Sequence, residues 1–146
     1  MPADAPPQDP LLTPFAIGNR VIKNRIFSSG HALSHAANGR ATQTTLDYQK
    51  EKALGGIGLS FVGGSGTVSP DTAPVFDQLV IDDDIVPFFQ ELAAFYHRHD
   101  ALLMTQITHL GRRTHANAGE WVPIVAPSAI RETLHRGFPR EMDEED

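Results

Sequence analysis

The stretch TTLDYQKEKALGGIGLSFVGGSG, residues 44–66, changes from helical to extended character within a few residues. Good helix formers follow a threonine, Thr44 or Thr45, that can cap a helix, and two glycines then end it. The run Ile57–Val62 is short and mostly apolar, which is typical of a strand covered on both faces. A glycine-rich turn and a long loop follow that strand. The stretch therefore predicts a helix and a buried strand, the repeating unit of a parallel α/β sheet.

The same alternation continues on both sides of this stretch. Upstream, the segment 25–29 has the character of a short strand that ends at Gly30. Downstream, apolar residues spaced as on one helix face predict a helix behind an acidic triplet that suits its positive end. The apolar positions are Ile85, Phe88, Phe89, Leu92 and Tyr96, and the triplet is Asp82, Asp83 and Asp84. Residues 101–107 then predict a third strand, so the order is strand, helix, strand, helix, strand with right-handed crossovers.

Two further segments precede this α/β unit. In LLTPFAIGNRVIKNR, residues 11–25, two apolar runs flank Gly18-Asn19, which can adopt the positive φ angles of a tight turn, so a small hairpin is expected. Residues 1–10 are acidic and rich in proline, unlike a signal or transit peptide. They are expected to form a disordered tail.

Composition limits the classes of function. The chain has 146 residues, with 40% hydrophobic and 21% charged residues, which describes one soluble globular domain. Its net charge of −6 and lack of a basic run argue against nucleic acid or anionic membrane surfaces as partners. No apolar run approaches the roughly 20 residues that span a bilayer. With no cysteine, the chain offers no disulfide, thiolate metal site or iron–sulfur ligand, and a cytoplasmic location is expected.

The polar residues at the three strand ends are the candidate site. In a parallel sheet, the ends at Ser29-Gly30-His31-Ala32, Gly63-Gly64 and Gln106 meet at one edge. The first two ends bring backbone N–H groups with little bulk, and Gln106 brings an amide donor and an amide acceptor. A planar heterocycle with alternating carbonyl and N–H groups would satisfy this set. The alternative, which spacing alone favours, is that the glycines only make tight turns and Gln106 caps a neighbouring loop.

Other chemical templates fit less well. The sequence has no P-loop and no complete dinucleotide fingerprint, since Phe61 replaces the third glycine. His97 and His99 are two residues apart at a helix end and point to different faces, so no metal site is expected. The pattern favours surface positions for His31 and His35. The pair Arg112-Arg113 can hold an anionic substrate, but adjacent arginines in a polar loop are more often a solvated turn.

Four ordered motifs resemble the old yellow enzyme family. They are LLTPFAIGNRVIKNRIFSSGH (11–31), the strand end at Gly63-Gly64, QITHLGR (106–112) and VAPS (125–128). The resemblance covers residues 11–146 and is strongest to the branch that contains trimethylamine dehydrogenase, dienoyl-CoA reductase and demethylases of N-methylated amino acids and betaines. It implies an α/β fold that is the N-terminal part of a (β/α)₈ TIM barrel: a hairpin at the barrel's bottom and the first three strands.

The resemblance also implies FMN and assigns positions to it. Ser29, Gly30, His31 and Ala32 would lie near N5 and the C4 carbonyl of the flavin, and Gly64 would add a backbone amide. Gln106 would pair with the pyrimidine edge, with His109 and Arg112 in supporting positions. Several relatives have Thr or Cys at the position of Ala32, and the Cys of trimethylamine dehydrogenase bonds to its flavin. Alanine cannot form that bond, so the FMN is expected to be non-covalent.

Three strands are fewer than such a barrel needs. A (β/α)₈ barrel takes about 250 residues, and the family's substrate-binding histidines and phosphate loops have no counterpart before Asp146. EMDEED, residues 141–146, is typical of an acidic lead-in to a helix. We expect either a fragment or a chain completed by a second polypeptide. A complete small protein is the least favoured of the three possibilities. An iron–sulfur cluster, a nicotinamide site and the catalytic acid or base would lie in those other regions.

The resemblance favours one reaction and leaves two alternatives. The preferred function is oxidative N-demethylation of a small methylated amine, amino acid or betaine by an FMN-dependent oxidoreductase. The second is reduction of an activated alkene by NAD(P)H. The third is a non-catalytic half-barrel that assembles with a partner chain.

Overall fold

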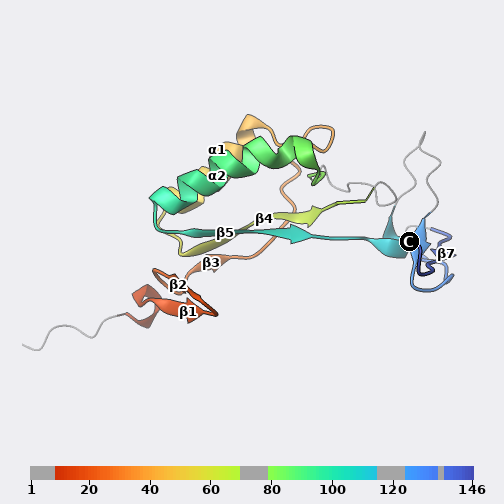
Figure 1. The fold of residues 1–146 in the computed structure, drawn as a ribbon, viewed down its shortest axis with the longest axis horizontal. Helices are drawn as coiled ribbons and strands as arrows, with labels where there is room; N and C mark the ends of the chain where they lie inside the picture. Colours follow the sequence, from red (N-terminus) through yellow and green to blue (C-terminus); the bar gives the residue numbers. More distant parts are fainter. Residues whose placement is uncertain (1–8, 70–78, 115–123, 135–136) are drawn as a thin grey trace, which may run out of the picture.

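The computed structural model describes residues 9–69, 79–114, 124–134 and 137–146 (Figure 1). In chain order the elements are η1 (Pro10–Leu12), β1 (Phe15–Ile17), β2 (Arg20–Ile22), β3 (Phe27–Ser28), α1 (Gln43–Leu54), β4 (Leu59–Gly66), η2 (Asp83–Ile85), α2 (Val86–Arg98), β5 (Leu102–Ile107), η3 (Gly111–Arg113), β6 (Val125–Ala126) and β7 (Arg140–Glu141). Most of the expected tail, residues 1–8, lies outside the described residues, and the 3₁₀ helix η1 already begins at Pro10. Within the described parts, no helix is long and apolar enough to cross a membrane.

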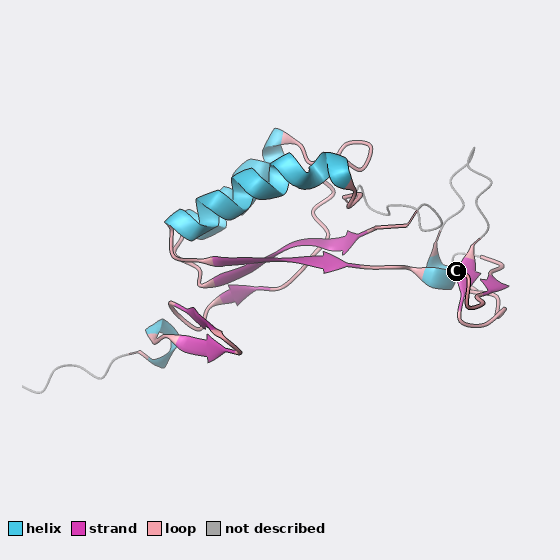
Figure 2. Cartoon of the chain, viewed as in Figure 1, coloured by secondary structure: helices cyan, strands magenta, loops and turns pink. Residues whose placement is uncertain are grey.

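The predicted α/β order is confirmed. Strands β3, β4 and β5 form a three-stranded sheet in that spatial order, and both neighbouring pairs are parallel. The crossovers contain α1 and α2, which lie side by side on one face of the sheet (Figures 1 and 2). Because the strands are parallel, their C-terminal ends all point to the same edge, where the candidate residues were expected.

Helix α1 is capped by a different threonine from those predicted. The cap is Thr42, whose Oγ1 accepts from the Thr45 backbone N–H, while the Thr45 Oγ1 accepts from the Thr42 N–H, both at 3.3 Å. Thr42 has the extended backbone of a cap residue (φ −95°, ψ 170°), which lets its side chain turn back over the first turn. Thr45 is therefore the reciprocal partner and Thr44 is an exposed helical residue. The predicted end of the helix is correct, because Gly55 is its C-cap.

The core lies between the helices and the sheet. On the predicted stripe of α2, Leu92 and Tyr96 are fully buried, and Phe88 and Phe89 pack against the core from its margin. The Tyr96 hydroxyl donates to the Gln49 carbonyl of α1 at 2.7 Å, so the two helices share a buried hydrogen bond.

The acidic triplet begins the 3₁₀ turn η2 instead of α2 itself, and Asp82 caps that turn. Arg40 from the β3–α1 loop forms a two-pronged ion pair with Asp82.

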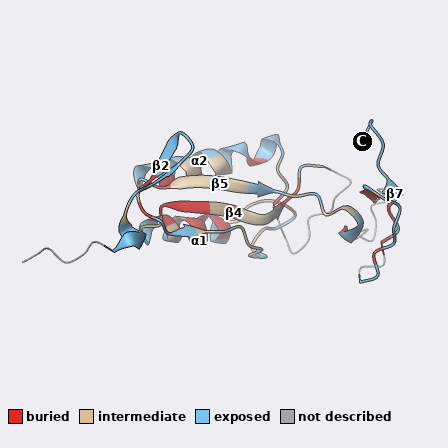
Figure 3. Ribbon diagram, turned by 90° about the horizontal axis from the view of Figure 1, so that it is seen from below, coloured by how far each residue is buried: buried red, intermediate tan, exposed pale blue. Residues whose placement is uncertain are grey.

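Strand β4 begins at Leu59, two residues later than predicted, and differs from the prediction in two further ways. It continues through the glycines to Gly66, with an irregularity in its pairing after Val62, where Gly63 has a positive φ of 71°. It is also covered by helices on one face only. On the other face, Phe61 pairs with Met104, which is 49% exposed, and Phe27 is 60% exposed (Figure 3). The long loop predicted after β4 lies mainly at residues 70–78, outside the described residues.

The predicted N-terminal hairpin is confirmed. Strands β1 and β2 pair antiparallel around Gly18, whose φ is 58°. The hairpin is tied to the N-terminal ends of the sheet strands, since Asn24 donates its side-chain amide to the Gly56 carbonyl at 2.8 Å. Between hairpin and sheet lies an open apolar cavity of about 420 Å³. Its lining residues are Phe15, Ile17, Ile22, Arg25, Phe27, Leu59 and Phe61.

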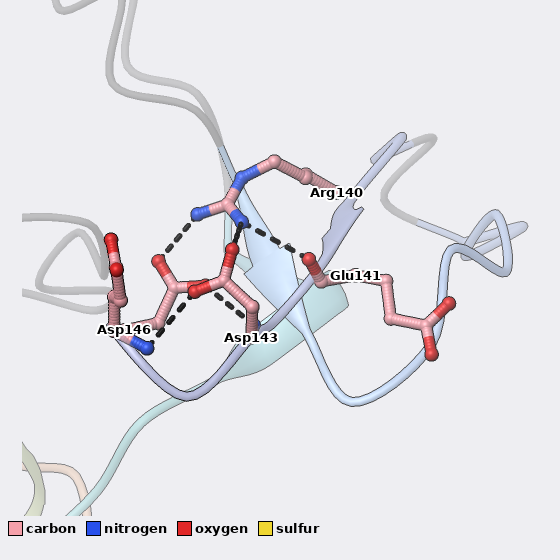
Figure 4. Close-up of polar contacts among 5 residues, drawn as sticks. Arg140, Glu141, Asp143 and Asp146 are labelled. Carbon is pink, nitrogen blue, oxygen red and sulfur yellow. Dashed lines mark hydrogen bonds and ion pairs between the residues drawn. The ribbon is translucent and has the colours of Figure 1, made fainter.

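The C-terminal segment forms a small parallel pair of its own, β6 with β7. Arg140 forms ion pairs with Asp143, at 3.5 Å, and with Asp146 (Figure 4). Asp143 Oδ1 accepts from the Glu145 N–H at 3.0 Å, and Asp146 Oδ2 accepts from the Asp143 N–H at 2.9 Å. The Asp143 and Asp146 side chains thus satisfy backbone N–H groups within this acidic turn. The expectation that EMDEED leads into a helix stays a prediction.

Candidate functional site

The ends of β3, β4 and β5 come together around two glycines. A Cβ built on Gly30 would overlap the Gln106 Oε1 and lie 2.6 Å from the Gly63 carbonyl oxygen. A Cβ on Gly64 would lie 2.5 Å from both the His31 carbonyl carbon and the Ala32 nitrogen. The turn after β3 therefore lies against the end of β4, and the Gln106 side chain of β5 reaches the same turn.

Neither Gly30 nor Gly64 is needed for backbone conformation. Gly63 has a positive φ, as a turn glycine does, but Gly30 and Gly64 do not. What excludes a side chain at these two positions is the closeness of neighbouring backbone and of Gln106. The alternative that the glycines serve only tight turns holds for Gly63, and close approach explains the other two.

His31 is fixed on both sides of its ring. Its Nδ1 lies 2.9 Å from the Ser29 carbonyl oxygen and its Nε2 lies 2.9 Å from the Tyr48 hydroxyl. The expectation of plain surface positions is wrong for His31, and also for His35, because both rings are partly buried and pack edge-on against Tyr48. Tyr48 thus joins α1 to the turn that carries the candidate site.

Lys52, one helical turn after Tyr48, contacts the same region. Its ammonium donates to Ser28 Oγ at 3.0 Å and lies 4.6 Å from the centroid of the Tyr48 ring. Burial lowers the pKa of Lys52, since the charged ammonium is partly withdrawn from water. Sequence reasoning missed Tyr48 and Lys52. Their spacing of four residues puts them on one face of α1, and this was the available signal.

The two supporting residues lie beyond the end of β5. His109 is exposed, and its Nδ1 accepts from the Gly111 N–H at 3.0 Å. Arg112 is an exposed residue of the 3₁₀ helix η3, which contacts β6. The observed η3 turn fits a solvated position for Arg112 and Arg113, and a supporting role for His109 and Arg112 stays a prediction.

The donor set at the strand ends suits a flat, neutral to anionic heterocycle. It combines main-chain amides at small residues with one side-chain amide, which can donate and accept at once. Gln106 is exposed, and its Oε1 lies against Gly30. In the parts of the chain that the structure describes, no group of three or more His, Asp or Glu side chains could hold a metal ion.

Curated relatives match almost the whole chain. The model of the NADH:flavin oxidoreductase / NADH oxidase family matches residues 10–146. A probable N-methylproline demethylase from Rhizobium meliloti is 39% identical over 96% of this chain and 21% of its own length. A multifunctional alkene reductase/demethylase from Caballeronia cordobensis is 42% identical over 94% and 21%, respectively. An N,N-dimethylglycine/sarcosine dehydrogenase from Chromohalobacter salexigens is 41% identical over 94% and 20%. The chain thus spans about a fifth of the length of these relatives.

Solved structures share the fold. An old yellow enzyme from Pichia sp. AKU4542 superposes with a TM-score of 0.82 at 19% identity, covering 93% of this chain and 38% of that one. A 2-naphthoyl-CoA reductase complex has a TM-score of 0.79 at 25% identity, covering 93% and 23%. In these TIM-barrel enzymes the matched region is an N-terminal part, as predicted, and the residues described here contain three strands and no closed barrel. The chain belongs to the NADH:flavin oxidoreductase / NADH oxidase family and has the fold of the N-terminal part of its barrel.

Proposed function

We propose that this chain supplies one end of the FMN site of an oxidoreductase. The observation that carries the proposal is the meeting of Gly30, Gly64 and Gln106 at one edge of the sheet. The residues assigned to the site are Ser29, Gly30, His31, Ala32, Gly64 and Gln106. Bound FMN supplies a two-electron carrier that can accept or deliver hydride.

The chain's own groups would hold and orient that cofactor. Without Cβ atoms at Gly30 and Gly64, the three strand ends pack closely enough to bring the His31–Ala32 peptide and Gln106 to one place. Gln106 would orient the pyrimidine edge by donating and accepting hydrogen bonds. Backbone N–H groups at His31 and Ala32 would stabilise negative charge on the reduced ring, because fixed dipoles need no reorganisation. Ala32 has no nucleophilic atom, which supports non-covalent binding.

Oxidative N-demethylation of a small methylated amine or amino acid is the favoured reaction. The similarity to proteins named N-methylproline demethylase and N,N-dimethylglycine/sarcosine dehydrogenase supports it. Reduction of activated alkenes at NAD(P)H expense is the second candidate, supported by the relative whose name combines alkene reductase and demethylase. A non-catalytic half-barrel remains the third.

We further propose that the remaining strands of the barrel cover the bare face of the sheet. They would come from further polypeptide, either of the same protein or of a partner chain. The apolar cavity beside Phe27 and Phe61 supports this, because an exposed apolar area of that kind is rare unless something covers it. The acid or base, any nicotinamide site and any iron–sulfur cluster would lie in that further polypeptide.

Anaerobic spectroscopy on the protein as isolated tests the function. We expect the absorbance of oxidised flavin, released by denaturation as free FMN because it is not covalently bound. Bleaching by N-methylproline or dimethylglycine supports demethylation, and bleaching by NADPH alone supports alkene reduction. Flavin that neither compound reduces would leave only the non-catalytic reading, and absence of flavin would overturn the proposal. The intact mass of the native particle would identify the polypeptide that completes the barrel.

A further inference from the structure

We propose that Tyr48, assisted by Lys52, is a positioning residue that sets the orientation of the His31–Ala32 peptide toward the flavin. The inference rests on the proposed function, since it concerns how the same site is held. It assigns to helix α1 a role in the site beyond its packing against the sheet.

The hydrogen bonds around His31 determine which ring nitrogen carries the proton. A carbonyl oxygen can only accept, so His31 Nδ1 must be protonated to bond the Ser29 carbonyl. In the neutral ring, Nε2 is then an acceptor, and the Tyr48 hydroxyl donates to it across 2.9 Å. The two bonds support the same tautomer and hold the ring from opposite sides.

The fixed ring is directly connected to the peptide that faces the site. The carbonyl carbon of His31 and the nitrogen of Ala32 are the atoms nearest to the space above Gly64, 2.5 Å from where a Cβ would be. This peptide is one that the proposed function places against the flavin. A rotation of His31 would tilt the N–H of the His31–Ala32 peptide away from the flavin. A contact that fixes the His31 ring therefore also fixes this N–H donor.

Lys52 restrains Ser28, three residues before His31. Its bond to Ser28 Oγ and its position over the Tyr48 ring join helix α1 to the last residue of β3. Cation–π contact and the hydrogen bond together keep the Tyr48 ring from turning away from His31. Tyr48 and Lys52 therefore hold the turn at two points, just before and within the candidate site.

Tyr48→Phe tests the assignment, because it removes the donated hydrogen bond and keeps the ring. Tyr96→Phe is the matched control: it also removes a tyrosine hydroxyl bond, donated from α2 to the Gln49 carbonyl of α1, in which His31 takes no part. We would measure three quantities on the intact protein: the ¹⁵N shifts of the neutral His31 ring, the FMN dissociation constant and the flavin midpoint potential. Thermal unfolding of each variant shows how much stability is lost.

The expected result has three parts. Tyr48→Phe should move the His31 nitrogens away from a pure Nδ1–H tautomer and weaken FMN binding about 3- to 10-fold, the value of roughly one hydrogen bond. It should also make the potential more negative, because the reduced ring loses an oriented donor. Tyr96→Phe should lower thermal stability and leave the His31 nitrogens and the potential unchanged.

Other results would overturn the inference in recognisable ways. Unchanged His31 nitrogens in Tyr48→Phe would mean that the hydrogen bond does not exist in solution, whether or not flavin binds. Changed nitrogens with unchanged flavin affinity and potential would show that the bond does not reach the site. Equal effects of both variants on the flavin would assign them to general destabilisation. A wild-type protein without flavin would instead overturn the proposed function, which the other three outcomes leave standing.

Discussion

Single atoms decide where a ligand can approach this sheet edge. At Gly30 and Gly64 the backbone would accept other residues, yet a methyl group at either position would overlap neighbouring atoms. At Gly64 those atoms belong to the His31–Ala32 backbone, which cannot rotate aside as a flexible side chain can. The glycines therefore allow close packing between two strand ends, and this packing sets where the His31–Ala32 peptide lies.

Replacing Gly64 by alanine should abolish FMN retention with little loss of secondary structure. The added Cβ would lie 2.5 Å from the His31–Ala32 peptide, so that peptide must shift by about an ångström or the β4 end must move. Flavin content per chain after purification measures the result. Gly55→Ala is the control, because it adds a methyl group at an ordinary φ of −67° with its nearest neighbour at 3.3 Å. Full flavin content in Gly64→Ala would contradict the assignment of this strand end to the site.

Replacing Ala32 by threonine should shift the midpoint potential of the flavin. Ala32 is exposed beside the peptide that we assign to N5 and the C4 carbonyl, and a hydroxyl there would add a hydrogen-bonding group near the ring. Anaerobic redox titration of wild type and variant gives the comparison. A potential equal to wild type within error would show that residue 32 is not beside the ring.

At the scale of elements, apolar periodicity and glycine positions predicted the order of helices and strands correctly, whereas the residue that caps α1 was predicted wrongly. The stripe on α2 and the apolar runs of β4 and β5 depend on burial, which affects many residues at once, so the order of elements was predictable. The cap of α1 depends on one residue's backbone angles, and several threonines compete for it. The contact of Tyr48 with His31 joins residues 17 apart. It was not predictable, because it depends on how α1 lies over the strand ends.

The corrected helix cap leads to a prediction with a built-in control. Thr42→Ala should lower the free energy of unfolding by about 1 kcal/mol, because it removes the acceptor that satisfies the Thr45 N–H. Thr44→Ala should change it by less than about 0.5 kcal/mol, since Thr44 is an exposed position of the first turn. Denaturant titrations of both variants measure the difference. A larger loss of unfolding free energy in Thr44→Ala than in Thr42→Ala would mean that Thr44 caps the helix, as the sequence predicted.

At the scale of the whole molecule, the sheet is finished on one face only. Helices α1 and α2 bury Val62 completely on their side, while Phe27, Phe61 and Met104 form an apolar surface on the other. The curated relatives carry about five times the length of this chain, and the solved structures that share its fold are TIM barrels of which it matches about 20–40%. The apolar run of β4 predicted a strand covered on both faces, but a local pattern does not reveal which polypeptide covers the second face, because the covering strands need not be near in sequence.

The proposed cover gives this surface a measurable property. If barrel strands enclose it, Phe27→Gln in the native protein should cost about 3 kcal/mol or more, as for loss of a buried phenylalanine. If the face stays bare, the same change should cost less than about 0.5 kcal/mol, because Phe27 would be as exposed as it is in this chain, 60%. Leu54→Gln is the control, because Leu54 is a similarly exposed apolar residue, 55%, at the C-terminal end of α1. Denaturation of the native particle distinguishes the cases: a loss at Phe27 no larger than that at Leu54 would mean that no further strands pack on this sheet.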